Sequence, residues 1–126
     1  MIRHLKRYLA IRSYVRRLSQ DLLRRFGKRK FYSVEQVSQA ALRGKFSTAF
    51  IAYAHATFCN QTDFDAHYEP LRVAGSYLGL RRLVGRRYLS GRLDFDAVTV
   101  ISKYRHTDYG GDNYYESGLG DGGNGN

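Results

Sequence analysis

Tryptophan, proline and cysteine are absent or nearly absent from this sequence. Its 126 residues contain no tryptophan, one proline (Pro70) and one cysteine (Cys59). A single cysteine excludes an internal disulfide and any zinc site built on several thiolates, and it favours a reducing compartment. The longest uncharged run, from Phe46 to Thr62, is interrupted by polar side chains, so no segment has the composition of a membrane span. Basic residues near the start also interrupt the pattern of a secretory signal, and we expect a cytoplasmic protein.

Acidic residues are nearly absent from the first part of the chain. Residues 1–30 contain eleven lysines and arginines and a single acid, Asp21. Residues 31–105 carry ten basic and six acidic groups, whereas residues 106–126 carry four acids and neither lysine nor arginine. The net charge of +10 therefore belongs mainly to one end of the chain. This asymmetry indicates an anionic partner.

Residues 2–26 have the periodicity of one long amphipathic helix. At 100° per residue, one narrow arc collects the apolar side chains of Tyr8, Ile11, Val15, Leu18, Leu22 and Phe26, and a wider stripe adds Leu5, Leu9 and Leu23. The opposite side collects the basic side chains of Arg3, Lys6, Arg7, Arg17, Arg24 and Arg25. No proline or glycine interrupts this pattern, and Gly27 suits the position just after the last turn.

Two further helices are predicted in the middle of the chain. Ser33 and Gln36 have the spacing of a capping box, which predicts a helix that begins there and ends near Gly44. A helix over Thr48–Cys59 follows, and its alanines and aromatic residues suggest burial on several sides. We expect this helix to lie at the centre of the core.

The next part of the chain predicts two more helices. Thr62 has the position of a cap for a short helix, which Pro70 would either kink or follow with a new first turn. Another helix is expected from Ser76 to about Leu89, with Gly91 just after its end.

Residues 95–104 have a pattern that fits a helix or a strand. Asp94 has the position of a helix cap, and Phe64 and Phe95, each between two aspartates, are expected to anchor their helices to the core. The β-branched residues of this segment would also suit a strand. A strand would have no partner here, so we expect a helix. The sequence thus predicts a small irregular all-α bundle of about five or six helices.

Residues 106–126 contain seven glycines together with acidic residues and tyrosines. Such a segment cannot bury enough surface to offset its ordering entropy, so we expect a disordered acidic tail. It would either compete with an anionic ligand for the basic helix or act as an inert solubilising tail. We therefore divide the chain into a basic helix with a Lys/Arg run (1–30) that forms part of the domain, a helical core (31–105) and this tail.

The basic helix allows three interpretations. It packs on the bundle with its arginines in water, or those arginines bind nucleic acid (RNA or DNA), or the helix lies on an anionic membrane surface. A second cluster, Arg81, Arg82, Arg86 and Arg87, favours nucleic acid, and the neighbouring Tyr77 and Tyr88 could stack on unpaired bases. The candidate anion-binding residues are this cluster together with Arg3, Lys6, Arg7, Arg17, Arg24 and Arg25. The membrane alternative requires Ile11, Val15 and Leu18 to face lipid.

Catalytic and metal sites are weakly supported. His55 and Cys59 are one helical turn apart and could share a metal with Asp63 and His67, but ordinary packing of a small buried thiol explains them better. An apolar setting would also raise the pKa of Cys59. We expect no catalytic residue, no metal and no cofactor. A protein-binding module remains as a further alternative.

Several short motifs resemble a family of short bacterial proteins of unknown function. They lie in the block that runs from Lys30-Phe31-Tyr32-Ser33 through Tyr53-Ala54-His55-Ala56 and in Asp63-Phe64-Asp65 after it. The resemblance extends to Arg87-Tyr88 and to residues 114–120, so that it covers most of the chain. The resemblance implies a small helical bacterial domain. It brings no activity, cofactor or catalytic residue.

Overall fold

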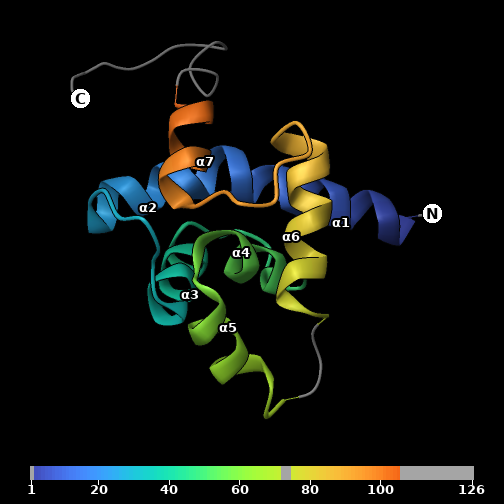
Figure 1. The fold of residues 1–126 in the computed structure, drawn as a ribbon. Helices are drawn as coiled ribbons and strands as arrows, with labels where there is room; N and C mark the ends of the chain where they lie inside the picture. Colours follow the sequence, from blue (N-terminus) through green and yellow to red (C-terminus); the bar gives the residue numbers. More distant parts are fainter. Residues whose placement is uncertain (1, 72–74, 106–126) are drawn as a thin grey trace.

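A computed structural model describes residues 2–71 and 75–105, and every regular element in these two ranges is helical (Figure 1). The first three elements run on without a break and form one long helix. The elements are α1 (Ile2–Ser13), the π-helical turn η1 (Tyr14–Leu18), α2 (Ser19–Phe26), α3 (Val34–Arg43), α4 (Ile51–Phe58), α5 (Gln61–Tyr68), α6 (Tyr77–Tyr88) and α7 (Ala97–Tyr104). With the long helix counted once, the described residues form six helices, which confirms the expected all-α fold. The predicted tail, 106–126, lies outside the described residues.

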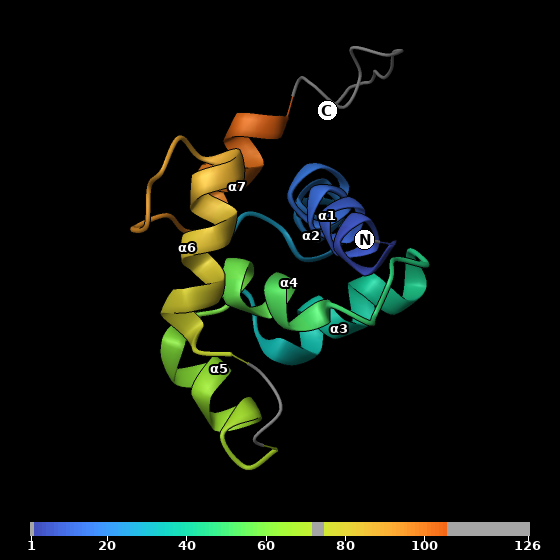
Figure 2. The ribbon, with the colours of Figure 1, turned by 90° about the vertical axis from the view of Figure 1, so that its right-hand side faces the viewer.

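The long helix crosses the whole molecule (Figure 1). Figure 2 looks nearly along it and shows α6 and α7 on one side, with α3 and α4 below. The middle of the long helix and α2 contact α7, α2 also contacts α3, and α6 packs mainly on α4. The core therefore lies between the long helix and the shorter helices that surround it.

The apolar arc of the long helix faces this core. Ile11 is 2% exposed, and Val15, Leu18 and Leu22 are fully buried. Their spacing of three to four residues brings them to one side of the helix, where burial of each side chain contributes about 1.5–3 kcal/mol. Tyr8, toward the start of the arc, is 36% exposed. The predicted packing of the arc is thus correct in its middle and incomplete at its N-terminal end.

The π-helical turn η1 was not predicted. A π turn holds more residues than an α turn and so rotates the residues that follow it around the helix axis. The polar residues Ser19 and Asp21, just after η1, are buried. Ser19 satisfies its hydroxyl by donating to the carbonyl of Val15 at 2.7 Å.

Local capping signals explain where several helices begin. Ser33 caps α3 through the predicted capping box, with Ser33 Oγ accepting from the amide of Gln36 at 3.1 Å. Ser76 caps α6 through its hydroxyl alone, with Ser76 Oγ accepting from the amide of Gly79 at 3.0 Å. The helix α4 lies at the centre, as expected, and its second half is buried.

Two predicted caps are wrong. The helix α5 is capped by Asn60, whose side chain accepts from the amide of Asp63 at 2.8 Å, and Thr62 lies inside the helix. The helix α7 is capped by Asp96 rather than Asp94. Each prediction was displaced by two residues because a second good capping residue stood close by.

The region of α5 and α7 contains one proline, Pro70, and two buried phenylalanines, Phe64 and Phe95. Pro70 neither kinks α5 nor starts a new helix, because α5 ends at Tyr68 and Pro70 falls in the turn that follows. Phe64 and Phe95 are each 2% exposed, which confirms that both anchor their segments to the core. Residues 97–104 form a helix, as expected.

In the described ranges, no helix combines the length and the apolar character that crossing a bilayer requires.

Candidate anion-binding surface

The predicted basic arc of the long helix lies largely at the surface. Lys6, Arg17, Arg24 and Arg25 are exposed, and Arg7 is half-buried. Arg3 belongs to α1, but its side chain lies outside the described part of the structure. The basic surface therefore follows the helix from α1 to α2.

The charge at the C-terminal end of this arc is partly neutralised. Asp21, whose side chain is only 7% exposed, accepts from Arg25 Nε at 3.0 Å and also contacts the guanidinium of Arg24. Two guanidiniums thus share one carboxylate. Arg24 and Arg25 have part of their hydrogen-bonding capacity occupied before any ligand binds, whereas no ion pair involves Lys6 or Arg17 in the described residues.

Arg81 does not belong to the surface cluster, and its prediction as an anion-binding residue is wrong. Its side chain is 4% exposed and donates hydrogen bonds to carbonyl oxygens of Ala56 at 2.9 Å, of Leu93 at 3.2 Å and of Phe95. Its guanidinium also lies over the ring of Phe95, 3.8 Å from the centroid. Burial lowers the pKa of Arg81 below its ordinary value. Arg81 therefore holds α4, α6 and the segment before α7 together.

The remaining arginines of the second cluster are exposed on α6: Arg82, Arg86 and Arg87. Arg87 points toward the long helix, where its guanidinium lies 4.4 Å from the centroid of the Tyr8 ring. The end of α6 and the start of the long helix thereby form one basic surface.

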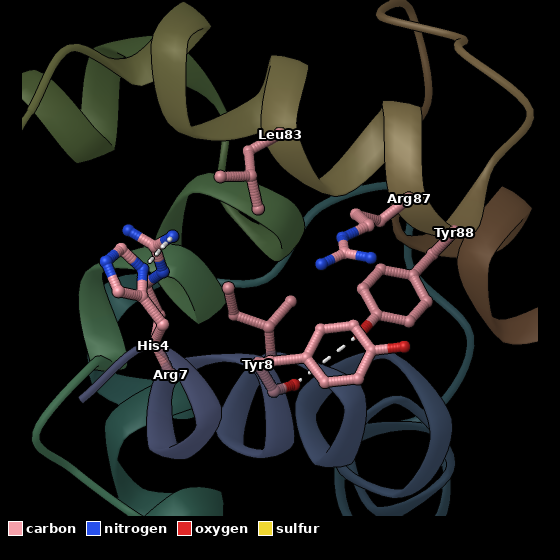
Figure 3. Close-up of a pocket in the computed structure, with 7 residues that line it drawn as sticks. His4, Arg7, Tyr8, Leu83, Arg87 and Tyr88 are labelled. Carbon is pink, nitrogen blue, oxygen red and sulfur yellow. Dashed lines mark hydrogen bonds between the residues drawn. The ribbon is translucent and has the colours of Figure 1, made fainter. Parts of the chain in front are cut away.

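A pocket of about 110 Å³ lies between α1 and α6. Figure 3 shows Leu83 and Arg87 reaching from α6 toward α1, with Tyr8 beside Tyr88 and with His4 and Arg7 at the other end. Its lining residues are His4, Arg7, Tyr8, Ile11, Leu83, Arg87 and Tyr88. Two guanidiniums from different helices thus face one hollow, and none of its lining side chains is acidic.

A second hollow, of about 360 Å³, adjoins this pocket and shares two of its residues. It is lined by His4, Arg7, Phe50 and Tyr53. Phe50 directly precedes α4, and Tyr53 lies in the first turn of that helix. Arg7 donates to His4 Nδ1 at 3.3 Å, which holds both side chains between the two hollows. The combined site places basic groups beside four aromatic rings, those of Tyr8, Tyr88, Phe50 and Tyr53.

The stacking role predicted for Tyr77 is wrong. Tyr77 is 7% exposed, and its hydroxyl donates to the carbonyl of Cys59 at 2.7 Å. Tyr88 lines the pocket but is 8% exposed, and its ring stacks on that of Tyr8 with 6.3 Å between centroids. Burial raises the pKa of Tyr88 to about 12, so its hydroxyl stays neutral. Tyr8, which the helical pattern assigned to the core, is the more accessible ring of the pair.

His55 and Cys59 lie inside the core and are already packed. His55 Nε2 is 2.8 Å from Ser38 Oγ, and its Nδ1 is bonded to the hydroxyl of Tyr68. Burial, with a smaller contribution from His67, lowers the pKa of His55 to about 4, and burial raises that of Cys59 to about 12. The described residues contain no group of three or more His, Cys, Asp or Glu placed to hold a metal ion. Neither His55 nor Cys59 lines the two hollows described above.

A third hollow, of about 280 Å³, lies along the outer side of the long helix near η1. It is lined by Leu9, Arg12, Ser13, Arg16 and Arg17. Arg16 Nε is buried there and has no hydrogen-bond partner among the described residues, and its guanidinium lies 5.8 Å from the centroid of the Tyr104 ring. Arg12, Arg16 and His4 are thus basic groups at surface hollows that the sequence analysis did not include among the candidates.

Comparison with known proteins places the chain in one family. No curated protein and no solved structure matches it. A family model does match, and it covers residues 2–126, nearly the whole chain. The protein therefore belongs to a family of unknown function, DUF6559.

Proposed function

We propose that this protein binds nucleic acid without catalysing a reaction. Exposed cations of the long helix, such as Lys6 and Arg17, and of α6, such as Arg82, would neutralise backbone phosphates. Such contacts release condensed counterions and do not depend on base sequence.

The burial of the apolar arc is the observation that carries this proposal. Ile11, Val15 and Leu18 are 0–2% exposed, so the long helix already uses its apolar face to build the core. A helix that lies on a membrane places that face among the lipid headgroups. With the face occupied, the long helix offers its partner mainly charge, which matches a polyanion better than a lipid surface.

The placement of the reactive side chains supports a non-catalytic role. His55 has hydrogen-bond partners on both ring nitrogens, and the raised pKa of Cys59 keeps its thiol protonated near neutral pH. A nucleophile needs an accessible site and an activated form. The thiol of Cys59 is fully buried and has neither.

A salt series of binding tests the proposal. The full chain is mixed with labelled RNA, with DNA and with anionic vesicles at 50 to 300 mM salt, and affinity is read from fluorescence anisotropy or vesicle sedimentation. We expect log K for nucleic acid to fall linearly with log salt, with a slope of about −4 or steeper if five or more phosphates are contacted. The variant R82Q/R86Q should weaken binding about threefold to tenfold, while R92Q, at an arginine paired with Asp94, serves as the matched control. Absence of binding to any nucleic acid at low salt would disprove the proposal.

Attachment to an anionic membrane surface is the second candidate, and one observation favours it. Leu5 and Leu9 are 57% and 46% exposed, and they lie one turn apart on α1. An exposed apolar pair flanked by arginines can insert into a headgroup layer. If vesicles bind and L5Q/L9Q abolishes that binding while nucleic acid does not bind, this candidate replaces the first.

A further inference from the structure

The pocket between α1 and α6 differs from the rest of the basic surface because it combines cations with accessible aromatic rings. On the outer arc, Lys6 and Arg17 can contact phosphates of any nucleic acid. In the pocket, Arg87 lies over the ring of Tyr8 and Arg7 lies beside His4 at the other end (Figure 3), and the adjoining hollow adds Phe50 and Tyr53. We infer that this pocket and its adjoining hollow hold an unpaired nucleotide, so that the protein prefers single-stranded over duplex nucleic acid. The inference rests on the proposed function and names its ligand more closely.

The two arginines suit a phosphate group. Guanidinium groups present planar pairs of donors that match phosphate oxygens, and those of Arg7 and Arg87 come from different helices to the same pocket (Figure 3). In residues 2–71 and 75–105, the ion pairs involve only the carboxylates of Asp21 and Asp94, neither of which lines the pocket. Within these ranges, no carboxylate therefore pairs with either guanidinium.

The pocket also holds these groups in place before binding. The guanidinium of Arg87 lies over the Tyr8 ring at 4.4 Å, Tyr8 is stacked on Tyr88, and Arg7 donates to His4. A cation above an aromatic face is attracted by the electrons of the ring, which limits the rotamers that Arg87 samples. Prior ordering lowers the entropy lost when a ligand binds.

The sizes of the two hollows fit the two parts of a nucleotide. Sites that enclose a whole small molecule measure about 300–1,000 Å³. The pocket of about 110 Å³ is smaller than this range and suits a single group such as a phosphate. The adjoining hollow of about 360 Å³ reaches the range and carries the rings of Phe50 and Tyr53, on which a base can stack.

Stacking on these rings requires a base whose face is free. In a duplex, each base face is covered by its neighbours, whereas single-stranded binding proteins stack successive bases on aromatic side chains. The outer arc would bind both forms through their phosphates. Only the pocket would then discriminate between them.

The test compares single strands with a duplex at one salt concentration. Labelled dT and rU strands of fifteen nucleotides and a DNA hairpin of equal charge are titrated with the full-length protein, and affinity is read from fluorescence anisotropy. We expect the single strands to bind about tenfold more tightly than the hairpin, since one stacked base contributes about fivefold to 150-fold. The dT and rU arms show whether the sugar matters.

Two pocket variants and two controls complete the experiment. Y53L, which removes a stacking ring, and R87Q should lower affinity for the single strands about fivefold or more and affinity for the hairpin less than about twofold. L42Q, at an exposed position of α3 outside both hollows, should bind as the wild type does, and R82Q, on the same helix as Arg87 but outside the pocket, should weaken both ligands equally. Thermal melts establish that each variant is folded. Ultraviolet crosslinking of bromouridine-substituted strands gives a second readout that does not depend on measured affinities, and the crosslink should form at Tyr8 or Tyr53.

Three results would overturn the inference. Equal affinity for single strands and hairpin removes it while leaving the proposed function intact. An equal loss for both ligands in R87Q makes Arg87 an ordinary phosphate contact and also removes it. Absence of binding to every nucleic acid removes the proposed function and the inference together.

Discussion

Arg81 donates a hydrogen bond to the carbonyl oxygen of Phe95 and so ties the middle of α6 to the segment that leads into α7. The same guanidinium donates to the carbonyl of Ala56 on α4. A buried cation that forms no ion pair in the described residues is thus stabilised by backbone carbonyls.

The first prediction concerns this buried arginine. Arg81→Lys should lower the free energy of unfolding by about 3 kcal/mol, because an ammonium group cannot reach the carbonyls of α4 and those of the segment before α7 at once. Arg82→Lys, at the exposed neighbouring position, should change it by less than about 0.5 kcal/mol. Urea unfolding of both variants checks the pair. Equal stabilities would show that the carbonyl contacts of Arg81 contribute little.

The second prediction concerns the two glycines of α6. A Cβ at Gly85 would lie 1.9 Å from the carbonyl oxygen of Arg92, whereas a Cβ at Gly79 would meet only the hydroxyl of Ser76, at 2.8 Å. Gly85→Ala should therefore lower the free energy of unfolding by about 3 kcal/mol, because the backbone near Arg92 has to move. Gly79→Ala should stay within about 1 kcal/mol of the wild type, since the gain in helix propensity offsets a small shift of Ser76.

Thermal unfolding measures this contrast directly. Gly85→Ala should lower Tm by roughly 10 °C or more in a domain of about 100 ordered residues. Similar Tm values for the two variants would mean that the segment around Arg92 is free to move away from α6.

The third prediction is an acid sensitivity caused by His55. Its pKa is about 4 in the folded protein, against 6.5 for the exposed group. Above pH 6.5 the imidazole is neutral in both states, and its full contribution to stability is present. As the pH falls from 6.5 toward 4, the unfolded chain takes up a proton that the folded protein does not, so stability falls by about 1.4 kcal/mol per pH unit.

The measurement is urea unfolding between pH 5 and pH 7.5, where most carboxylates stay ionised. His55→Gln removes the titrating group, so the variant should show a flatter pH dependence whatever its stability at pH 7.5. Parallel curves for wild type and variant would contradict a buried neutral imidazole at this position.

The fourth prediction tests the caps that the structure assigns. Asn60→Ala and Asp96→Ala should each lower the free energy of unfolding by about 1 kcal/mol, because each leaves a helix N-terminal amide without its acceptor. Thr62→Ala and Asp94→Ala, two residues away in each case, should change it by less than about 0.5 kcal/mol. If Thr62→Ala and Asp94→Ala lowered stability more than Asn60→Ala and Asp96→Ala, the caps would be those expected from the sequence.

The caps also show what local sequence signals can and cannot predict. Ser33 and Gln36 formed the expected capping box because both partners lie within one turn and no better capping residue stands nearby. Around Phe64 and Phe95 several good capping residues occur within a few positions. Which of them begins the helix depends on how the phenylalanine enters the core, and that is a property of the tertiary structure.

Only the part of the candidate site that lies on α1 could be predicted from the sequence. Helical spacing brings His4, Tyr8 and Ile11 to one face of α1, and this much could be read from the sequence. The helix that covers that face could not, because α6 is more than 60 residues away from α1 along the chain. Arg81 and Arg82 are neighbours of the same type, and only their different directions around the axis of α6 make one buried and the other exposed.

The fifth prediction separates the paired from the unpaired arginines of the long helix. Arg24 contacts Asp21, whereas Arg17 makes no ion pair in the described residues and lies over the ring of Phe46 at 5.3 Å. Both variants, Arg17→Gln and Arg24→Gln, remove one positive charge. Their effects on phosphate binding should nevertheless differ, because Arg24 has to give up part of its contact with Asp21 before it can bind a phosphate.

The slope of log K against log salt for duplex DNA measures that difference. Arg17→Gln should reduce its magnitude by about 0.9, the contribution of one phosphate contact, and Arg24→Gln should reduce it by clearly less. If both variants reduce the slope equally, net charge alone governs binding and the carboxylate of Asp21 does not compete with phosphate. If neither reduces it, the phosphate contacts lie elsewhere on the basic surface, and Arg82 and Arg86 of α6 become the residues to vary.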